Sequence, residues 1–286
     1  MINSKSAHSI DISYSEYYVA YLDVLGFEDL VLRNNAASRK ILNKYFKLIH
    51  KLTDDLNAIK YELTFGSITI SDSVILSVPV GKTNTDKITR LRNLCVAICK
   101  IQYALALENI WLRGAVSSGQ AYFNKKDNQV VGPAYIQAYK LERRHAVYPR
   151  VIIDTKLIKE LETTSAQELI DTINNPGLDG TKTLPWERNV LYQWQHNNVF
   201  TQRYLQRDVV LFIDYLHRVF NEQTEYVKIL NNISYSIYSK NEVYSKYRWL
   251  VNYLLSNTDY YLNRPDTEIK IPRNALGRYY DELNKF

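Results

Sequence analysis

The sequence has 286 residues, of which 46% are apolar and 23% are charged. This length and composition exclude a mainly disordered chain, and they allow either one large domain or a domain with an appended module. The formal net charge of +6 suits an anionic ligand such as a nucleotide, but a charge of this size is also common in proteins without such a ligand.

The N-terminal segment, MINSKSAHSIDISYSE, is polar and lacks the apolar stretch of a signal peptide. The sequence also contains no apolar run long enough for a transmembrane helix. We therefore expect a cytoplasmic protein that does not insert directly into a membrane.

The hydrophobic pattern predicts alternating strands and helices in the first half of the chain. The expected elements are, in order, a strand over 17–25 that is buried on both faces and ends at Gly26, a short helix, a helix over 36–58, two hairpin strands over 60–65 and 68–79, a helix over 86–108, a strand over 111–123, a helix over 132–146 and a strand over 150–154. This order is typical of an α+β fold, or α/β sandwich, with helices on one side of a mixed sheet.

Residues 171–186 are rich in Pro and Gly and are the best candidate for a domain boundary. They separate a first domain over 1–170 from a mostly helical extension over 186–286. Within that extension, RDVVLFIDYL predicts a short strand running into a helix, and EVYSKYRWLVNYLLSN predicts an amphipathic helix.

Cys95 and Cys99 are four residues apart in the helix expected over 86–108, which places both on one face of that helix. Because this arrangement disfavours an intrachain disulfide, we interpret them as core residues of a reduced protein and not as a metal pair. The five histidines are scattered, and none has a second ligand at zinc-site spacing.

Two aspartates stand out because apolar residues surround them. Asp23 interrupts the apolar strand just before the Gly26 turn, and Asp72 lies at or near the turn of the hairpin. A buried carboxylate is costly unless it is paired or bound to a metal, and two acids on neighbouring strand ends can share a pair of divalent cations. The alternative is that Asp23 caps the following helix and that Asp72 lies in an exposed turn.

Several other classes of enzyme lack their motifs in this sequence. A haloacid-dehalogenase phosphatase needs a second Asp two residues after the first, and Leu25 occupies that place. Neither a GxxxxGK[ST] loop nor a GxGxxG fingerprint occurs, and no elbow motif supports a Ser–His–Asp triad.

Four segments, taken in order, resemble the class III nucleotidyl cyclases: YLDVLGF, ISDSVILS, LRGAVSSGQAYF and GPAYIQAYKLERRHAVYPRVIID. The GPA…AY.LE and YPR segments are most similar to the pyrimidine cyclases of Pycsar antiphage systems. The resemblance covers about residues 17–155, and LFIDYL and KYRWLVNYL are less specifically similar to the C-terminal part of the same group. It implies a palm-like catalytic domain with a mixed sheet.

The resemblance also implies roles for individual residues. Asp23 and Asp72 match the acids that bind two divalent ions, Mg²⁺ or Mn²⁺, and the backbone carbonyl of Val24 would contact one ion. Gly26 and Phe27 match the turn whose N–H groups contact the triphosphate.

The helix that follows Gly132 departs from the family pattern. Ile136 and Lys140 stand where many members have an Asn and an Arg that contact the ribose and the transition state. Lys140 could replace the Arg as a cation without its bidentate geometry, whereas Ile136 cannot replace an Asn. The family's purine-reading Lys would fall at Ile68, and its absence fits a different base.

Other basic residues have two interpretations each. Arg113 points at the base or a phosphate, or else it forms a surface ion pair. Arg143, Arg144 and Arg150 form a basic rim for phosphates, or else the first two belong to a solvated helix end.

The resemblance implies a homodimeric nucleotidyl cyclase that converts a pyrimidine nucleoside triphosphate to the 3′,5′-cyclic nucleotide and pyrophosphate. UTP is expected before CTP, because a site rich in arginine donors prefers the two carbonyl acceptors of uracil to the exocyclic amine of cytosine. Lys140 from the partner subunit would stabilise the developing charge, and a separate effector protein would sense the product in antiphage defence. The alternatives are a purine cyclase or oligonucleotide-forming palm enzyme, and a degenerate domain that binds nucleotide without turnover. Ile136 favours the degenerate domain, and the presence of both acids opposes it. Nucleic-acid binding is disfavoured because no aromatic–basic interleaved motif occurs.

Overall fold

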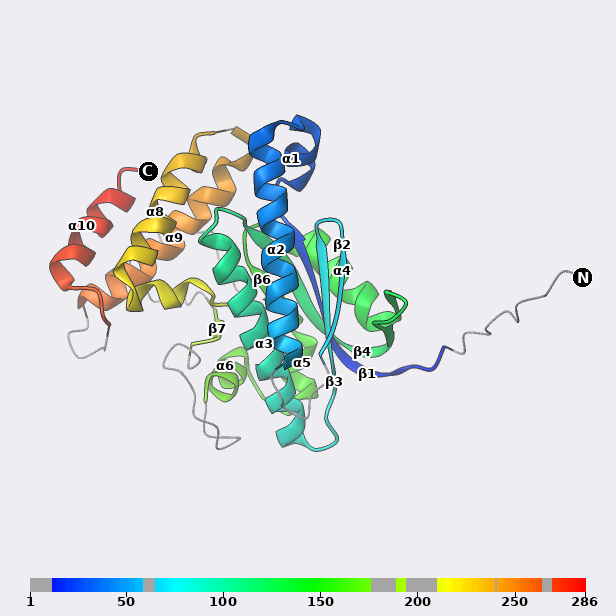
Figure 1. Ribbon diagram of the computed structural model, residues 1–286. Coiled ribbons are helices and arrows are strands. Elements are labelled where there is room, and N and C mark those ends of the chain that lie inside the picture. The colour runs from blue at the N-terminus through cyan, green and yellow to red at the C-terminus, as the bar shows by residue number, and fades with distance from the viewer. Residues whose placement is uncertain (1–11, 59–64, 176–188, 194–209, 240, 264–268) are drawn as a thin grey trace, which may run out of the picture.

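The computed structural model describes residues 12–58, 65–175, 189–193, 210–239, 241–263 and 269–286. Strands and helices alternate in the N-terminal part, and a layer of helices follows (Figure 1). The strands are β1 (Ser15–Val24), β2 (Gly66–Ile70), β3 (Ser73–Pro79), β4 (Leu112–Asn124), β5 (Gln129–Val131), β6 (Val151–Ile153), β7 (Leu191–Tyr192) and β8 (Phe212–Ile213). The helices are α1 (Phe27–Arg33), α2 (Ala36–Ala58), α3 (Asn84–Ala106), α4 (Pro133–His145), α5 (Lys156–Glu160), α6 (Ala166–Asn174), the 3₁₀ helix η3 (Leu216–Asn221), α8 (Gln223–Ile237), α9 (Asn241–Asn263) and α10 (Arg273–Leu283).

The strands of the described residues form one mixed sheet. Seven of them have the order β2-β3-β1-β4-β6-β8-β7, and β5 pairs with β4 outside this path. β1 runs antiparallel to both β3 and β4, whereas β4 and β6 run parallel to each other. A mixed sheet with packed helices, followed by further helices, confirms the predicted α+β class.

Helices cover both faces of the sheet, so the predicted arrangement with helices on one side is wrong. Tyr18 and Leu22 of β1 belong to the large hydrophobic core that includes α2 and α3. Val19, from the other face of β1, packs with Ala134 of α4. Both faces of β1 are apolar, and each must therefore be shielded from water by a helix layer. α2 and α3 lie on one side of the strands and α4 lies on the other (Figure 1).

The predicted hairpin is present, but its first strand begins later than expected. β2 starts at Gly66, Phe65 lies outside it, and 60–64 are outside the described residues. Ile70 pairs with Ser73, which makes Ser71 and Asp72 a two-residue turn. Ser71 adopts a φ of 57°, a left-handed conformation that such tight turns require.

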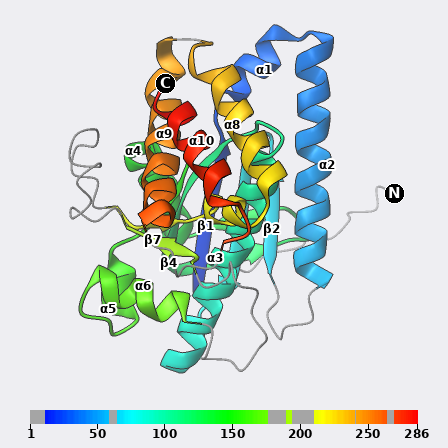
Figure 2. The ribbon, with the colours of Figure 1, turned by 90° about the vertical axis from the view of Figure 1, so that its left-hand side faces the viewer.

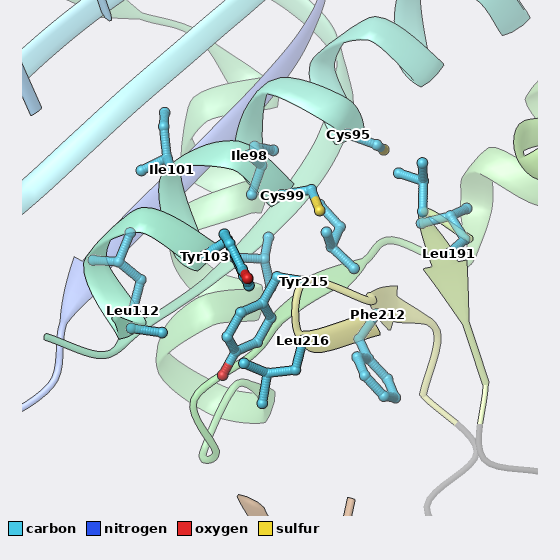
Figure 3. Close-up of a cluster of buried hydrophobic side chains, with 14 of the residues drawn as sticks. Cys95, Ile98, Cys99, Ile101, Tyr103, Leu112, Leu191, Phe212, Tyr215 and Leu216 are labelled. Atoms are coloured by element: carbon cyan, nitrogen blue, oxygen red, sulfur yellow. The ribbon is translucent and has the colours of Figure 1, made fainter. Parts of the chain in front are cut away.

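The C-terminal part continues the same sheet and the same core. β8 pairs with β6 through Ile152 and Phe212, and β7 pairs with β8. Cys95 and Cys99 of α3 are buried free thiols beside residues of β7, β8 and η3, which confirms them as core residues (Figure 3). The division into a domain over 1–170 and an extension over 186–286 stays a prediction. The sheet and the hydrophobic core both contain residues from the two parts.

Helices α8, α9 and α10 form a layer at one side of the sheet (Figure 2). The predicted amphipathic helix over 242–257 lies within α9, and its buried residues include Trp249 and Tyr253. None of the helices in the described ranges combines the length and the apolar character needed to cross a lipid bilayer.

The close approach of β1 and β4 at Gly114 generates a stability prediction. A Cβ at this position would lie 2.4 Å from the Tyr21 carbonyl oxygen and 2.8 Å from Leu22 Cδ2. We expect Gly114→Ala to lower the free energy of unfolding by about 1–3 kcal/mol, as overpacking typically does. Denaturant unfolding measures this difference.

Gly277→Ala in α10 is the matched control, because a Cβ at Gly277 meets no atom within 4 Å. That variant should be neutral or more stable by up to about 1 kcal/mol, since Ala favours helix over Gly. Equal stability of the two variants would contradict the close approach of the strands.

Candidate functional site

The sheet brings three charged side chains together at one end of β1. Asp23 is the penultimate residue of β1, and its neighbours across the sheet are Ser73 of β3 and Arg113 of β4. Asp72 immediately precedes Ser73 in the hairpin turn. The register of three adjacent strands therefore brings Asp23 and Asp72 together beside Arg113. The two aspartates are called the acidic cluster below.

Arg113 links Asp23 to a third acid, Glu142 of α4. Its Nε and Nη2 atoms each lie 3.1 Å from Oδ2 of Asp23. Nε also lies 2.8 Å from Oε1 of Glu142. The exposed side-chain fraction is 29% for Arg113, 16% for Asp23 and 4% for Glu142, so this is a half-buried network and not a surface ion pair.

Burial and two neighbouring charges act on the carboxyl of Asp23. Burial raises the pKa of the Asp23 carboxyl, the positive charge of Arg113 opposes this rise, and the negative charge of Asp72 adds to it. Two carboxylates in this relation disfavour being ionised together, and a bound cation would remove that penalty.

Of the two alternative roles, the structure excludes helix capping by Asp23 and agrees in part with a turn position for Asp72. Asp23 does not cap the following helix, because the N-cap of α1 is Gly26 and no side chain caps it. Asp72 does lie in the hairpin turn, but it is half-buried and beside Asp23.

Glu142 was missed from the sequence, although a signal for it existed. Helix α4 buries Ala134, Ala138 and Glu142, which recur at four-residue spacing along one face. Glu142 is the charged residue of that buried stripe. Such a residue must find a partner inside the fold, and Arg113 of β4 is that partner.

The hydroxyl of Tyr45 in α2 is a further polar atom near the acids. Tyr45 is 1% exposed, and its hydroxyl oxygen has no hydrogen-bond partner among the described residues. Burial raises the pKa of this phenol, and the negative charges of Asp72 and Asp23 contribute to the rise. A buried hydroxyl without a partner is costly unless a ligand or water completes it.

These residues fit a divalent cation of the Mg²⁺ type. Such ions take one or two carboxylates from the protein and complete their octahedral shell with water and substrate phosphates. Asp23 and Asp72 supply two carboxylates, and the Tyr45 hydroxyl could bond a water of that shell. No larger group of His, Cys, Asp or Glu side chains in the described part of the chain could hold a metal ion.

The predicted nucleotide-contacting turn lies directly after the acids. Val24 ends β1, and the Leu25 N–H donates to the Trp111 carbonyl over 2.8 Å. Gly26 adopts a left-handed φ of 75°, and Phe27 is buried at the start of α1. The roles of Val24, Gly26 and Phe27 stay predictions, as do those of Asp23 and Asp72.

Lys140 and Ile136 lie on the exposed side of α4, whereas Glu142 lies on its buried side. Both are exposed on α4, and the exposed fraction of Ile136 is 44%. Ile68 is 1% exposed and packs against Val19 and Ala134, so it reads no base. Arg150 is also buried, with its guanidinium near the ring of Trp249, which contradicts a place on a basic rim.

The sequence pattern also indicated no role for Lys246 of α9. Burial lowers the pKa of its ammonium group, the charge of Arg113 adds to this effect, and the charge of Asp23 opposes it. A residue from the C-terminal helices thus lies within the electrostatic reach of the acidic cluster.

The buried position of Glu142 generates a pH-dependent prediction. Burial raises the pKa of its carboxyl from 4.5 to about 6, with Arg113 opposing the rise. Across this pH window the folded chain binds more protons than the unfolded chain, so the free energy of unfolding falls as the pH rises. Glu142→Gln lacks this titration and should gain up to about 2 kcal/mol relative to wild type between pH 4.5 and pH 7.

Denaturant unfolding at several pH values measures this gain, with the exposed Glu282 of α10 changed to Gln as the control. Glu282→Gln should follow wild type across the window. If Glu142→Gln also follows wild type, Glu142 does not carry the raised pKa.

No family model matches the sequence, and no curated protein matches it. Among solved structures, the chain is similar to the monomeric guanylyl cyclase domain of the RhoGC fusion protein from the aquatic fungus Blastocladiella emersonii, with 16% identity and a TM-score of 0.41 over 54% of this chain and 89% of that one. A bacterial light-regulated adenylyl cyclase is 14% identical, with a TM-score of 0.36 over 54% of this chain and 47% of that one. A class III adenylyl cyclase-like ATP-binding protein from Pseudomonas aeruginosa is 13% identical, with a TM-score of 0.32 over 56% of this chain and 35% of that one. The chain is thus similar to each of them over about half of its own length.

Proposed function

We propose that this chain is a nucleotidyl cyclase whose acidic cluster binds the triphosphate of a nucleoside triphosphate through divalent cations. One observation carries the proposal: β1 and the β2–β3 turn bring Asp23 and Asp72 together, with Arg113 and Glu142 behind them. The ordered segments that resemble class III cyclases support the same assignment.

The metal ions of this proposal are Mg²⁺ or Mn²⁺. When bound, such ions neutralise charge on the triphosphate and lower the pKa of the ribose 3′-hydroxyl. Asp23 and Asp72 would hold them, together with the Val24 carbonyl. The N–H groups of the Gly26–Phe27 turn would orient the phosphates.

The proposed reaction is an intramolecular substitution at the α-phosphorus. The 3′-hydroxyl gives its proton to water, its oxygen forms a bond to the α-phosphorus, the bond from phosphorus to the bridging oxygen breaks, and pyrophosphate leaves. Cationic side chains stabilise the negative charge that develops on the phosphoryl oxygens. Arg113 cannot do so while it pairs with both Asp23 and Glu142, and the proposal therefore assigns this role to Lys140.

The position of Lys140 supports an assembly of two chains. Glu142 lies on the buried face of α4, whereas Lys140 is exposed on the outer surface of that helix. A cation that points away from its own acidic cluster can serve the cluster of a second copy. We therefore propose a homodimer in which each site takes acids from one chain and Lys140 from the other.

The pyrimidine base is supported by the resemblance to the Pycsar cyclases, and the order UTP before CTP by the preference of arginine donors for carbonyl acceptors. The same resemblance supports a cyclic pyrimidine nucleotide as a signal for a separate effector protein in antiphage defence. Ile68 adds no base contact because it is packed under α4.

A second candidate function is nucleotide binding without turnover, as part of a regulatory domain. Ile136 favours it, because an exposed isoleucine cannot orient a ribose by hydrogen bonding. The two candidates share the acidic cluster and differ in whether product is formed.

Product analysis separates these candidates. Purified protein is incubated with each of the four nucleoside triphosphates and Mn²⁺, and the products are identified by mass spectrometry. We expect 3′,5′-cyclic UMP as the main product, and at least a hundredfold loss of it in Asp23→Asn and Asp72→Asn, since each removes a ligand of the metal ions that would bind the reacting triphosphate. The thermal midpoint of Asp23→Asn should be unchanged or raised, because burial already disfavours the charged Asp23.

The exposed Asp281 of α10, changed to Asn, is the control and should retain wild-type turnover. Full turnover in Asp23→Asn or Asp72→Asn would contradict the metal site. Binding of a nucleotide without any product would favour the regulatory candidate, and a cyclic purine nucleotide as the main product would contradict the pyrimidine base alone.

Subunit mixing tests the homodimer. Asp23→Asn and Lys140→Ala chains should each be inactive alone. Mixed in equal amounts, they should recover about a quarter of wild-type activity, because half of the dimers are heterodimers with one intact site. Recovery is measured after mixing and re-equilibration, and an active monomer or two inactive chains that never complement would contradict the shared site.

A further inference from the structure

The first half of α9 is anchored beside the acidic cluster. The rings of Tyr247 and Trp111 meet edge to face, with centroids 6.1 Å apart. Trp111 immediately precedes β4, two residues before Arg113, and its carbonyl accepts the Leu25 N–H of the turn after β1. Tyr247 therefore packs on the residue that ties β4 to the end of β1.

A second contact fixes the same part of the helix. Trp249 is 2% exposed and stacks on Tyr148, with centroids 5.7 Å apart and ring planes at 9°. The guanidinium carbon of Arg150 lies 5.3 Å from the Trp249 ring. Aromatic and cation–π contacts of this kind hold a helix in one position and orientation.

Lys246 immediately precedes Tyr247, so it lies on the turn of α9 that packs beside the strand carrying Arg113. It is half-buried, and its ammonium interacts electrostatically with Arg113 and Asp23. No carboxylate among the described residues forms an ion pair with it. The guanidinium of Arg113 already forms ion pairs with Asp23 and Glu142. A partly desolvated ammonium without a carboxylate partner is stabilised by an anionic ligand.

We propose that Lys246 binds the phosphate oxygens of the nucleoside triphosphate at the Asp23–Asp72 site, so that the C-terminal helix α9 forms one wall of that site. The identity of the ligand as a nucleotide rests on the proposed function. The recognition itself needs only a condensed phosphate chain.

The charges of the site agree with this role. The carboxylates of Asp23 and Asp72 would offset part of the charge of the bound divalent cations. The charge of Arg113 is neutralised by Asp23 and Glu142. A triphosphate carries more negative charge than two divalent cations offset once the charges of Asp23 and Asp72 are counted, so its terminal phosphates are stabilised by a further cation. An ammonium is suited to this because it is a compact charge with three donors.

The contribution of α9 also gives the C-terminal part a function. The contacts of Tyr247 with Trp111 and of Trp249 with Tyr148 fix the part of α9 that carries Lys246. Any movement of α9 away from these residues would withdraw a phosphate-binding cation.

The test uses inorganic tripolyphosphate as the probe, with Mn²⁺ present and the full chain. Titration calorimetry compares wild type with Lys246→Met, which keeps the apolar stem, and with Lys246→Arg, which keeps the charge. We expect the dissociation constant of tripolyphosphate to rise at least tenfold in Lys246→Met and less than threefold in Lys246→Arg, as loss of a charge-assisted hydrogen bond predicts. Thermal melting confirms that both variants fold.

Lys285→Met is the control, because it removes the same charge from an exposed lysine near the C-terminus, far along the chain from Lys246. It should bind tripolyphosphate like wild type. Unchanged binding in Lys246→Met, equal weakening in Lys285→Met, or no binding by wild type would overturn the proposal.

The same variants separate this proposal from the cyclase assignment. Weaker tripolyphosphate binding in Lys246→Met supports the phosphate contact even if no nucleoside triphosphate yields a cyclic product. Cyclic product from wild type together with unchanged tripolyphosphate binding in Lys246→Met overturns the phosphate contact and leaves the cyclase assignment intact.

Discussion

The ion pair between Arg113 and Asp23 is the interaction on which the candidate site depends. β1 is covered on both faces, so a carboxylate near its end is partly removed from water and needs a counter-charge. Arg113 supplies that charge from the neighbouring strand, and Glu142 supplies a second carboxylate that fixes the guanidinium. A divalent cation that binds Asp23 would compete with Arg113, and Glu142 would then keep the displaced guanidinium from being left without a partner.

The C-terminal residues belong to this arrangement structurally. β8 extends the sheet from β6, and α9 packs through Tyr247 on Trp111, next to the strand that carries Arg113. Removing the C-terminal helices would expose buried rings of the core and take away Lys246. With the role proposed for Lys246, folding and ligand binding would use the same contacts, which would couple the stability of the helical layer to the chemistry of the site.

Local patterns were enough to predict some of the fold and part of the site. Asp23 and Asp72 were identified because each interrupts an apolar run, and such interruptions are visible without knowledge of contacts. The expectation of helices on one face conflicted with the prediction that β1 is buried on both faces, and the structure follows the burial. The partners of the acids were not found, because the pairing of Arg113 with Glu142 and its proximity to Lys246 depend on how distant segments pack.

Helix α4 explains how one element can serve two sites. Residues two apart in a helix are separated by about 200° around its axis, so Lys140 and Glu142 point to nearly opposite sides. Glu142 fixes Arg113 inside its own chain, whereas Lys140 is presented to the surroundings. In the proposed function, the acids of one chain would form the site for cations and phosphate, and a cation aimed at the α-phosphorus from α4 would come from a second chain. The difference between a nucleotide-binding domain and a cyclase would then lie in the assembly of two chains, not in the acidic cluster that both would share.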